Sequence, residues 1–241
     1  MASNLAGGVN LGHFNACVFR AALLNADCSP TQGTNGGIVT AGLVTMTATP
    51  DVEEGTVFEP KTGCGSIAYT AEETDKIKRY NVSGEFIFFD QELMVTLFGG
   101  SLVLGAAGGD FAGEVIGWSA PRYDEADNHY GAYLEVITRS AAEGAGDCIS
   151  AGTGRPTHFG NIFGKARLVP GERVFENGEG RVAFTGKATN NPTLFDGPWN
   201  DYPGSTYVPN SPYTHVGYSQ AEYNAIEALV GVGFVDLPTA S

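Results

Sequence analysis

Basic residues are scarce in this sequence, and all but Arg20 lie between residues 61 and 187. The chain of 241 residues has 13 Lys and Arg against 27 Asp and Glu, which gives a formal net charge of −14. No Lys or Arg occurs from residue 21 to residue 60, and none occurs after Lys187. A chain with this balance does not offer the broad basic face with which proteins wrap nucleic acid.

Cysteine is also rare, and its spacing argues against zinc binding and against a disulfide framework. The four are Cys17, Cys28, Cys64 and Cys148. We therefore expect buried, free thiols. The first 14 residues have neither a basic start nor a continuous apolar run, so no secretory signal is expected. The most apolar run, residues 93–107, is short and broken by glycine, which argues against a membrane span.

Motifs for catalysis and cofactor binding are lacking. The histidines are His13, His129, His158 and His215. No two of them have metal-ligand spacing, so we expect them to be structural or exposed. The glycine-rich stretch 144–154 has no Gly-Lys-Ser/Thr and is interpreted as a plain loop rather than a phosphate-binding one. We expect no catalytic residue, no metal and no cofactor.

The best candidate for a metal site is the acidic stretch 124–129, because hard oxygen ligands suit calcium. It lacks the full alternation of acidic positions and the central glycine of an EF-hand loop. A solvated acidic loop is the interpretation that we favour.

Glycine, by contrast, is abundant at 34 residues, while charged residues make up only 17% of the chain. This combination favours short strands joined by many turns. The clearest strand covers residues 80–88, where Tyr80, Val82 and Phe86 alternate with polar side chains and Phe88 continues the apolar face. Asp90 is typical of a helix N-cap, and Gly99 with Gly100 is typical of a helix end.

The segment that follows Asp90 has one apolar stripe, made by Leu93, Met94, Leu97 and Phe98. It predicts a short helix, after which residues 101–104 resume as a strand. A second strong pattern covers residues 158–189, where two alternating runs flank Asn177-Gly178 and predict a hairpin. The polar face of that hairpin carries Lys165, Arg167, Arg181 and Lys187. We expect these cations to pair with acidic neighbours rather than to bind phosphate.

From the positions of the expected strands, turns and breakers, we divide the chain into three parts. Residues 1–37 are interpreted as an N-terminal arm with one possible strand near 16–24, and residues 38–203 as the β domain. Within that domain we expect strands at 38–49, 66–70 and 132–138, with long loops at 51–75 and 105–157. The Pro-rich segment 190–212 should be irregular. Residues 204–241 form a C-terminal extension, with a helix at 219–229 capped by Ser219 and a strand at 232–237.

Three short motifs in residues 76–100 occur in a fixed order: Lys-x-Lys-Arg-Tyr, then Ser-Gly-x-Phe, then Phe-Asp-x-Glu-Leu with a closing Gly-Gly. Together with FTGKATNNPTLFDGPWNDYP at 184–203, they resemble the major tail tube proteins of long, non-contractile-tailed bacteriophages. The likeness covers residues 75–203. The matching positions are Tyr80, Gly84, Phe86, Asp90, Leu93, Gly99, Gly100, Gly186, Lys187, Ala188, Asp196, Gly197 and Pro198.

The resemblance implies a mainly antiparallel β-sandwich with one short packed helix, extended loops and arms. Such subunits form hexameric rings whose inner strands join into a continuous barrel, and the rings stack into a tube. The protein would be a structural part of the virion tail, made in the bacterial cytoplasm, without enzymatic activity. Its partners would be further copies of itself and the tape measure, tail terminator and distal tail proteins, with no membrane.

In such a tube, double-stranded DNA would pass through the bore without specific binding. A wall that neutralised phosphates would hold the DNA, so an acidic chain predicts a net negative inner wall. The sequence assigns no residue to that wall.

Other functions stay open from the sequence. A capsid decoration or tail completion protein is one. A carbohydrate-binding β-sandwich is another, and it would use exposed aromatic side chains in the Pro-rich segment: Trp199, Tyr202, Tyr207 and Tyr213. A hydrolase would be built on the carboxylates Asp124, Glu125 and Asp127, and would need a deep pocket that shifts their pKa values.

Overall fold

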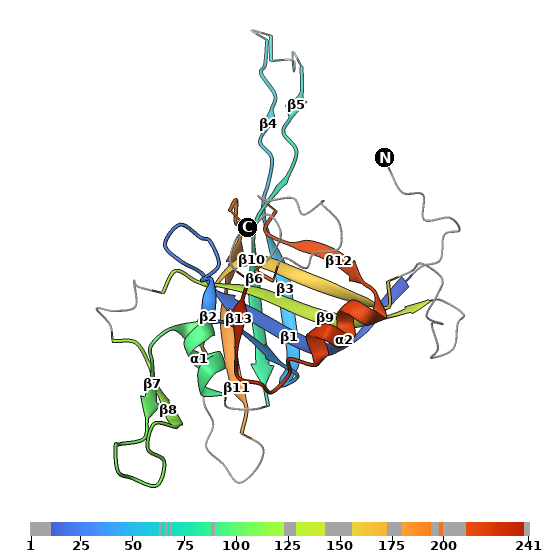
Figure 1. Cartoon of the computed structure of the whole chain (residues 1–241). Helices are drawn as coiled ribbons and strands as arrows, with labels where there is room; N and C mark the ends of the chain where they lie inside the picture. The colour runs from blue at the N-terminus through green and yellow to red at the C-terminus, as the bar shows by residue number, and fades with distance from the viewer. Residues whose placement is uncertain are drawn as a thin grey trace.

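The computed structural model describes residues 11–62, 64–65, 67, 69–87, 90–122, 129–142, 156–172, 180–193, 198–199 and 211–238. These residues are mainly β, with antiparallel sheets and two short helices, which confirms the expected β class (Figure 1). No sheet in this part of the chain closes on itself. None of its helices has the length and apolar character needed to cross a membrane.

One large sheet contains nine of the strands. They are β1 (Leu11–Leu23), β2 (Gly33–Thr40), β3 (Leu43–Glu53), β6 (Lys76–Phe86), β9 (Ala132–Ala142), β10 (His158–Pro170), β11 (Val182–Thr189), β12 (Thr214–Tyr218) and β13 (Phe234–Leu237). The order is β13-β2-β1-β9-β10-β11-β6-β3, and β12 also pairs with β10. Two small hairpins stand apart from it, β4 (Val57–Phe58) with β5 (Ala71–Glu72) and β7 (Ser101–Leu104) with β8 (Val115–Ser119).

Strand β10 joins the two halves of the large sheet, which are β13-β2-β1-β9 on one side and β11-β6-β3 on the other. Its first part, from His158 to Phe163, pairs with β9, and β12 pairs on the same stretch. Its second part, from Lys165 to Pro170, pairs with β11, while the pairing with β9 ends at Ala166 after a register shift between Phe163 and Ala166. Strands β1 and β9 consequently cross over β3, β6 and β11 (Figure 1).

The main core lies between the two halves of the sheet. The ring of Phe86 on β6 meets Phe19 on β1 edge-on, with centroids 5.0 Å apart, and stacks on Phe184 of β11 at 5.2 Å. Helix α1 (Gln91–Phe98) adds the buried side chains Leu93 and Leu97 to the same cluster. Burial of this apolar area is the main stabilising contribution to the fold.

Helix α1 begins and ends where the sequence predicts. The Asp90 carboxylate accepts hydrogen bonds from the backbone N–H groups of Glu92 (3.0 Å) and Leu93 (3.2 Å). At the other end Gly99 and Gly100 have positive φ of 75° and 90°. The predicted apolar stripe is buried as expected: Leu93, Met94, Leu97 and Phe98.

The last carbonyls of α1 are bound by side chains from outside the helix. Trp118 Nε1 donates to Gly99 O at 2.8 Å, and His129 Nε2 donates to Thr96 O at 3.1 Å. Such partners are needed because the final carbonyls of a helix have none within it. They tie α1 to β8 and to the start of β9.

The two ends of the chain differ from the arm and the extension that the sequence predicts. Residues 11–23 and 33–40 form β1 and β2, and β1 lies inside the large sheet between β2 and β9. At the other end β12, α2 (Gln220–Glu227) and β13 also join the body, through pairing with β10 and β2. Glycine and asparagine make these segments look irregular, yet their long-range pairing orders them. The expected helix is confirmed, with the Ser219 hydroxyl accepting from Glu222 N–H.

Two expected strands and one expected loop need correction. Residues 38–49 do not form one strand but two, because the chain turns at 41–42 between β2 and β3. The strand expected at 66–70 lies at Ala71–Glu72, preceded by a bridge between Lys61 and Ile67. The loop expected at 105–157 contains β8 and a β9 that is longer than predicted. The hairpin of β10 and β11 is confirmed by its register, while its turn at 173–179 lies outside the described residues.

Candidate interaction surfaces

One half of the large sheet has two open edges. In the order β10-β11-β6-β3, the outer side of β3 has no neighbouring strand in the described part of the chain. The outer side of β10 is also open after Ala166, where the pairing with β9 ends. Val44 on β3 and Val169 on β10 are exposed there, Val169 to 59%. The open edge of β3 runs from Leu43 to Glu53, and that of β10 runs from Arg167 to Pro170. Such edges present unpaired backbone groups to another chain.

A proline inside β3 fits the position of this strand at an edge. Pro50 lies opposite Tyr80 of β6, within a strand that continues to Glu53. Proline has no N–H to donate, so it is tolerated in a sheet only where one side of the strand is unpaired. The sequence prediction that the strand ends at residue 49 is therefore wrong, because β3 continues through Pro50 to Glu53.

The segment between β3 and β6 is a hairpin that projects from the body (Figure 1). We call residues 54–75 the long hairpin. Its described apolar side chains are at least half exposed, including Phe58 at 51% and Tyr69 at 64%. Its base is fixed by Gly55 N–H, which donates to Asp75 Oδ1 at 2.8 Å. Exposed aromatic side chains on a projecting element are typical of a surface that another molecule covers.

The β7–β8 hairpin also points away from the core (Figure 1). It exposes Leu104, Phe111 and Ile116, with Phe111 at 60%. Trp118 anchors its base through the bond to Gly99 O and a ring contact with Phe98 at 6.4 Å. The molecule thus has two apolar projections, the long hairpin and the β7–β8 hairpin, and each is anchored at its base by a hydrogen bond.

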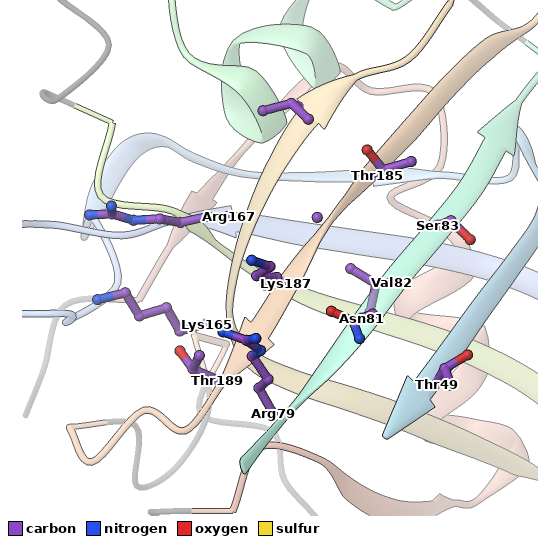
Figure 2. A pocket seen from close by; sticks show the side chains of 12 residues that line it. Thr49, Arg79, Asn81, Val82, Ser83, Lys165, Arg167, Thr185, Lys187 and Thr189 are labelled. Carbon is purple, nitrogen blue, oxygen red and sulfur yellow. The ribbon is translucent and has the colours of Figure 1, made fainter. Parts of the chain in front are cut away.

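A groove of about 830 Å³ crosses the outer surface of the half-sheet that has the open edges (Figure 2). We call its four basic residues the cationic face: Arg79, Lys165, Arg167 and Lys187. Figure 2 shows them gathered on one side of the groove. The rest of the described lining is mainly Thr, Ser, Asn and Val, and it includes no carboxylate.

The expected pairing of the basic residues with acids holds only in part. Arg181 pairs with Glu85 at 3.2 Å, and it does not line the groove. Arg79 pairs with Asp51 at 2.6 Å. Within the described ranges, neither Arg167 nor Lys187 has an ion-pair partner, and both are exposed. The sequence did not predict that Arg79 belongs to the cationic face. Arg79 lies there because β6 pairs with β11, a strand far away in the sequence.

The family-motif glycines occupy places where a side chain does not fit. A Cβ on Gly84 would lie 2.4 Å from Thr45 O and 2.6 Å from the Phe184 ring. A Cβ on Gly186 would lie 2.1 Å from Arg167 O. These glycines allow neighbouring strands and a core ring to approach closely.

The other motif positions have mostly structural places. Tyr80, Phe86, Leu93 and Ala188 contribute to the main core, and Pro198 is buried. Lys187 is the exception, because it lies on the cationic face. Asp196 and Gly197 lie outside the described residues.

A buried polar cluster was not foreseen. Arg20 on β1 and Glu135 on β9 are 1% and 0% exposed and form an ion pair. Tyr133 and Tyr218 both donate to the Glu135 carboxylate, at 2.9 and 2.8 Å. The Arg20 guanidinium also lies over the Trp199 ring, 4.5 Å from its centroid. The only sign of this cluster in the sequence is that Arg20 is a single basic residue in a stretch otherwise free of them.

This cluster weakens the carbohydrate-binding alternative. Trp199 is packed on Arg20 and on the Tyr133 ring, whose centroid is 5.9 Å away. Tyr213 is likewise held among Tyr80 and Phe163, at 5.6 and 5.4 Å. The other two aromatics proposed for sugar docking, Tyr202 and Tyr207, lie outside the described residues. The described pair is therefore not an exposed docking face.

The described histidine and cysteine side chains, which exclude those of His13 and Cys148, do not converge on a site. His158 stacks on Tyr223 with centroids 3.6 Å apart, His215 stacks on Phe159 at 4.5 Å, and His129 caps α1. The described cysteines are free, but they are not buried as expected: Cys17 and Cys28 are half-buried and Cys64 is exposed. Burial still raises the pKa of the Cys17 thiol.

Metal binding is not indicated in the part of the chain that the structure describes. No group of three or more acidic, His or Cys side chains suited to a metal occurs there. The acidic stretch 124–128, Cys148 and the glycine-rich stretch 144–154 lie outside the described residues.

Comparisons with known proteins give no family assignment. The chain matches no protein-family model, and a search of curated proteins finds no match.

Proposed function

We propose that this protein is a structural subunit that assembles with copies of itself into rings, and that the rings stack into a phage tail tube. The observation that carries the proposal is the half-sheet β10-β11-β6-β3, whose two outer strands both have an open edge. A protein that remains a monomer has to protect such edges, whereas a ring pairs each edge with a neighbour.

The strand directions are compatible with such a ring. Each of the three pairings in this half-sheet is antiparallel. With four alternating strands, β3 runs opposite to β10. In a ring with a rotation axis along the strands, β3 of one copy therefore meets β10 of the next copy in an antiparallel pair. The joined half-sheets would form one continuous barrel, and we take the ring to be hexameric from the resemblance to tail tube proteins.

The two apolar projections supply contacts beyond the ring. The long hairpin and the β7–β8 hairpin expose Phe58, Tyr69 and Phe111, which a neighbouring ring would cover. The complete tube would be a passive conduit for double-stranded DNA in the virion tail, without a catalytic role. The tape measure, tail terminator and distal tail proteins would contact its interior and its two ends.

Cysteine cross-linking tests the edge pairing directly. Thr47 on β3 and Val169 on β10 lie in the same row of side chains, through Ser83 and Thr185. Three strand spacings of about 4.8 Å separate them in one chain, which is too far for a disulfide. We expect Thr47→Cys with Val169→Cys, or the same scan at Thr45 and Thr49, to give a ladder of covalent oligomers that ends at six.

The variants that carry only one of the two added cysteines serve as matched controls, because they keep the four native cysteines as background: Cys17, Cys28, Cys64 and Cys148. They should give no ladder above a dimer. If no register in the scan produces a ladder under conditions where particles form, the edges do not pair and the proposed ring is wrong.

A further inference from the structure

The cationic face contains an arrangement that destabilises an isolated sheet. Arg167 on β10 and Lys187 on β11 are direct cross-strand partners. Continuing across the sheet, the next partners are Asn81 and Thr49, which carry no charge. Like charges placed directly opposite each other are unfavourable, and here no acid in the row offsets them.

The remaining two cations strengthen the local positive potential. Lys165 lies two residues before Arg167 on β10, with its Nζ 3.0 Å from Cys28 Sγ. Arg79 is the only one of the four that is paired with an acid among the described residues, and Asp51 does not line the groove. Four cations therefore share one groove in a chain whose net charge is −14.

The other lining groups indicate the chemistry of the ligand. Thr49, Ser83, Thr185 and Thr189 bring hydroxyl groups, and Asn81 brings an amide. Lys, Arg, Ser, Thr and Asn are the side chains with which proteins contact phosphate oxygens. Among the described residues, the lining contains no aromatic ring on which a base could stack. It therefore suits a phosphate backbone and not the bases.

The acidic long hairpin of a second copy is the competing occupant. It carries Glu54, Glu59, Glu72, Glu73 and Asp75, against Lys61. Docking it would also have to cover Phe58 and Tyr69, which are at least half exposed. Among the described lining residues, the only large apolar side chains are Val82, which is buried, and Val169. The lining thus presents no cluster of large apolar side chains to these rings, and the match rests mainly on charge.

We infer that the cationic face binds the sugar–phosphate backbone of nucleic acid, independently of base sequence. This surface lies within one chain, so the inference does not depend on ring formation. Binding is weak, since the rest of the acidic chain repels a polyanion. It is also strongly salt-dependent, because each neutralised phosphate contributes about −0.9 to the slope of log K against log salt concentration for duplex DNA.

The test is fluorescence anisotropy of a labelled duplex of about 20 base pairs, titrated with the full-length chain between about 50 and 200 mM salt. Lys165, Arg167 and Lys187 together predict a slope of about −2.7. The variant Arg167→Ser with Lys187→Ser should reduce the magnitude of the slope by about 2 and weaken binding equally for two unrelated sequences. Circular dichroism confirms that each variant is folded.

A matched control removes the same charge elsewhere. Lys61→Ser with Lys76→Ser changes two exposed cations outside the groove. This control should keep the slope of the unsubstituted chain. Equal slope changes in the two double variants, or no salt-dependent binding at the lowest salt, would overturn the inference. So would displacement of the duplex by a peptide of residues 51–75 that binds more tightly than DNA, because the groove would then belong to a second copy.

Discussion

Arg20 and Glu135 lie directly opposite each other on β1 and β9, and their ion pair has almost no contact with solvent. Glu135 also accepts hydrogen bonds from two tyrosines, so both carboxylate oxygens are used. Burying two charges costs solvation energy, and removing one partner leaves the other charge buried alone. The pair fixes how β1, β9 and β12 fit together.

The first prediction follows from that pair. Glu135→Leu should lower the free energy of unfolding by about 3–5 kcal/mol, because Arg20 would stay buried without its partner. Urea denaturation measures the loss. The variant Arg20→Met with Glu135→Leu should recover part of it, since no lone charge remains. A loss under about 1 kcal/mol for Glu135→Leu would mean that the ion pair is not buried in solution.

The second prediction concerns the close contact at Gly84. Gly84→Ala should destabilise the chain by about 1–3 kcal/mol, because the new methyl group meets Thr45 O and the Phe184 ring. Gly180→Ala is the matched control, since no atom lies within 4 Å of the added Cβ there. Thermal unfolding of both variants is the measurement. If the two melting temperatures fall equally, the strands do not approach as described.

The third prediction is a pH dependence that comes from His129. Burial lowers the pKa of His129 from its ordinary value of 6.5, and the charge of Arg167 acts in the same direction. The unfolded chain therefore takes up a proton at a higher pH than the folded chain. The stability from the neutral imidazole is complete above the ordinary pKa and is lost as pH falls through the folded pKa.

The measurement for His129 compares melting temperatures from about pH 7 down to about pH 5. His129→Gln keeps a donor for Thr96 O but does not titrate, so its melting temperature should fall less than that of the unsubstituted chain. The carboxylates titrate in both chains and cancel in the difference. Identical pH profiles would show that His129 is not buried as described.

The fourth prediction uses proteases to test the two projections. Trypsin should cut the free subunit first at Lys61 in the long hairpin, and chymotrypsin at Phe58 or Phe111, because these side chains are exposed on elements with few supporting contacts. Assembly should protect all three sites. Lys187 should resist in both states, since β11 pairs on both sides. Equal cleavage before and after assembly would exclude these hairpins as contacts between subunits.

Local sequence patterns were sufficient to predict part of the fold. The strand to Phe86, the cap at Asp90 and the helix that follows were predictable because each signal lies within a few residues of the element. The hairpin of β10 and β11 was predictable for the same reason, and it placed Lys165, Arg167 and Lys187 on one face.

The remainder depends on contacts between distant segments. The sequence predicts only one possible strand near 16–24 within an arm, yet β1 covers Leu11–Leu23 and pairs with β9 more than a hundred residues later. The addition of Arg79 to the cationic face and the ion pair of Arg20 with Glu135 need the same kind of long-range pairing. No periodicity within one segment carries that information.

The cationic face also bears on the bore of the proposed tube. The core packs on the other side of the half-sheet, so in the proposed barrel the cationic face would line the bore, against the acidic inner wall that the net charge favours. A tube whose wall presents Arg167 and Lys187 would contradict the acidic wall. It would place the proposed phosphate contact along the path of the DNA, where it would slow ejection most at low salt.

Negative-stain electron microscopy of the purified chain at increasing concentration, alone and with its tail partners, tests self-assembly most directly. We expect hollow rings and stacked tubes. A variant in which residues 56–72 are replaced by Asn-Gly should remain folded and lose the tubes, because the long hairpin would no longer reach a neighbouring ring. A compact monomer under every condition, including with those partners, would contradict the proposed function.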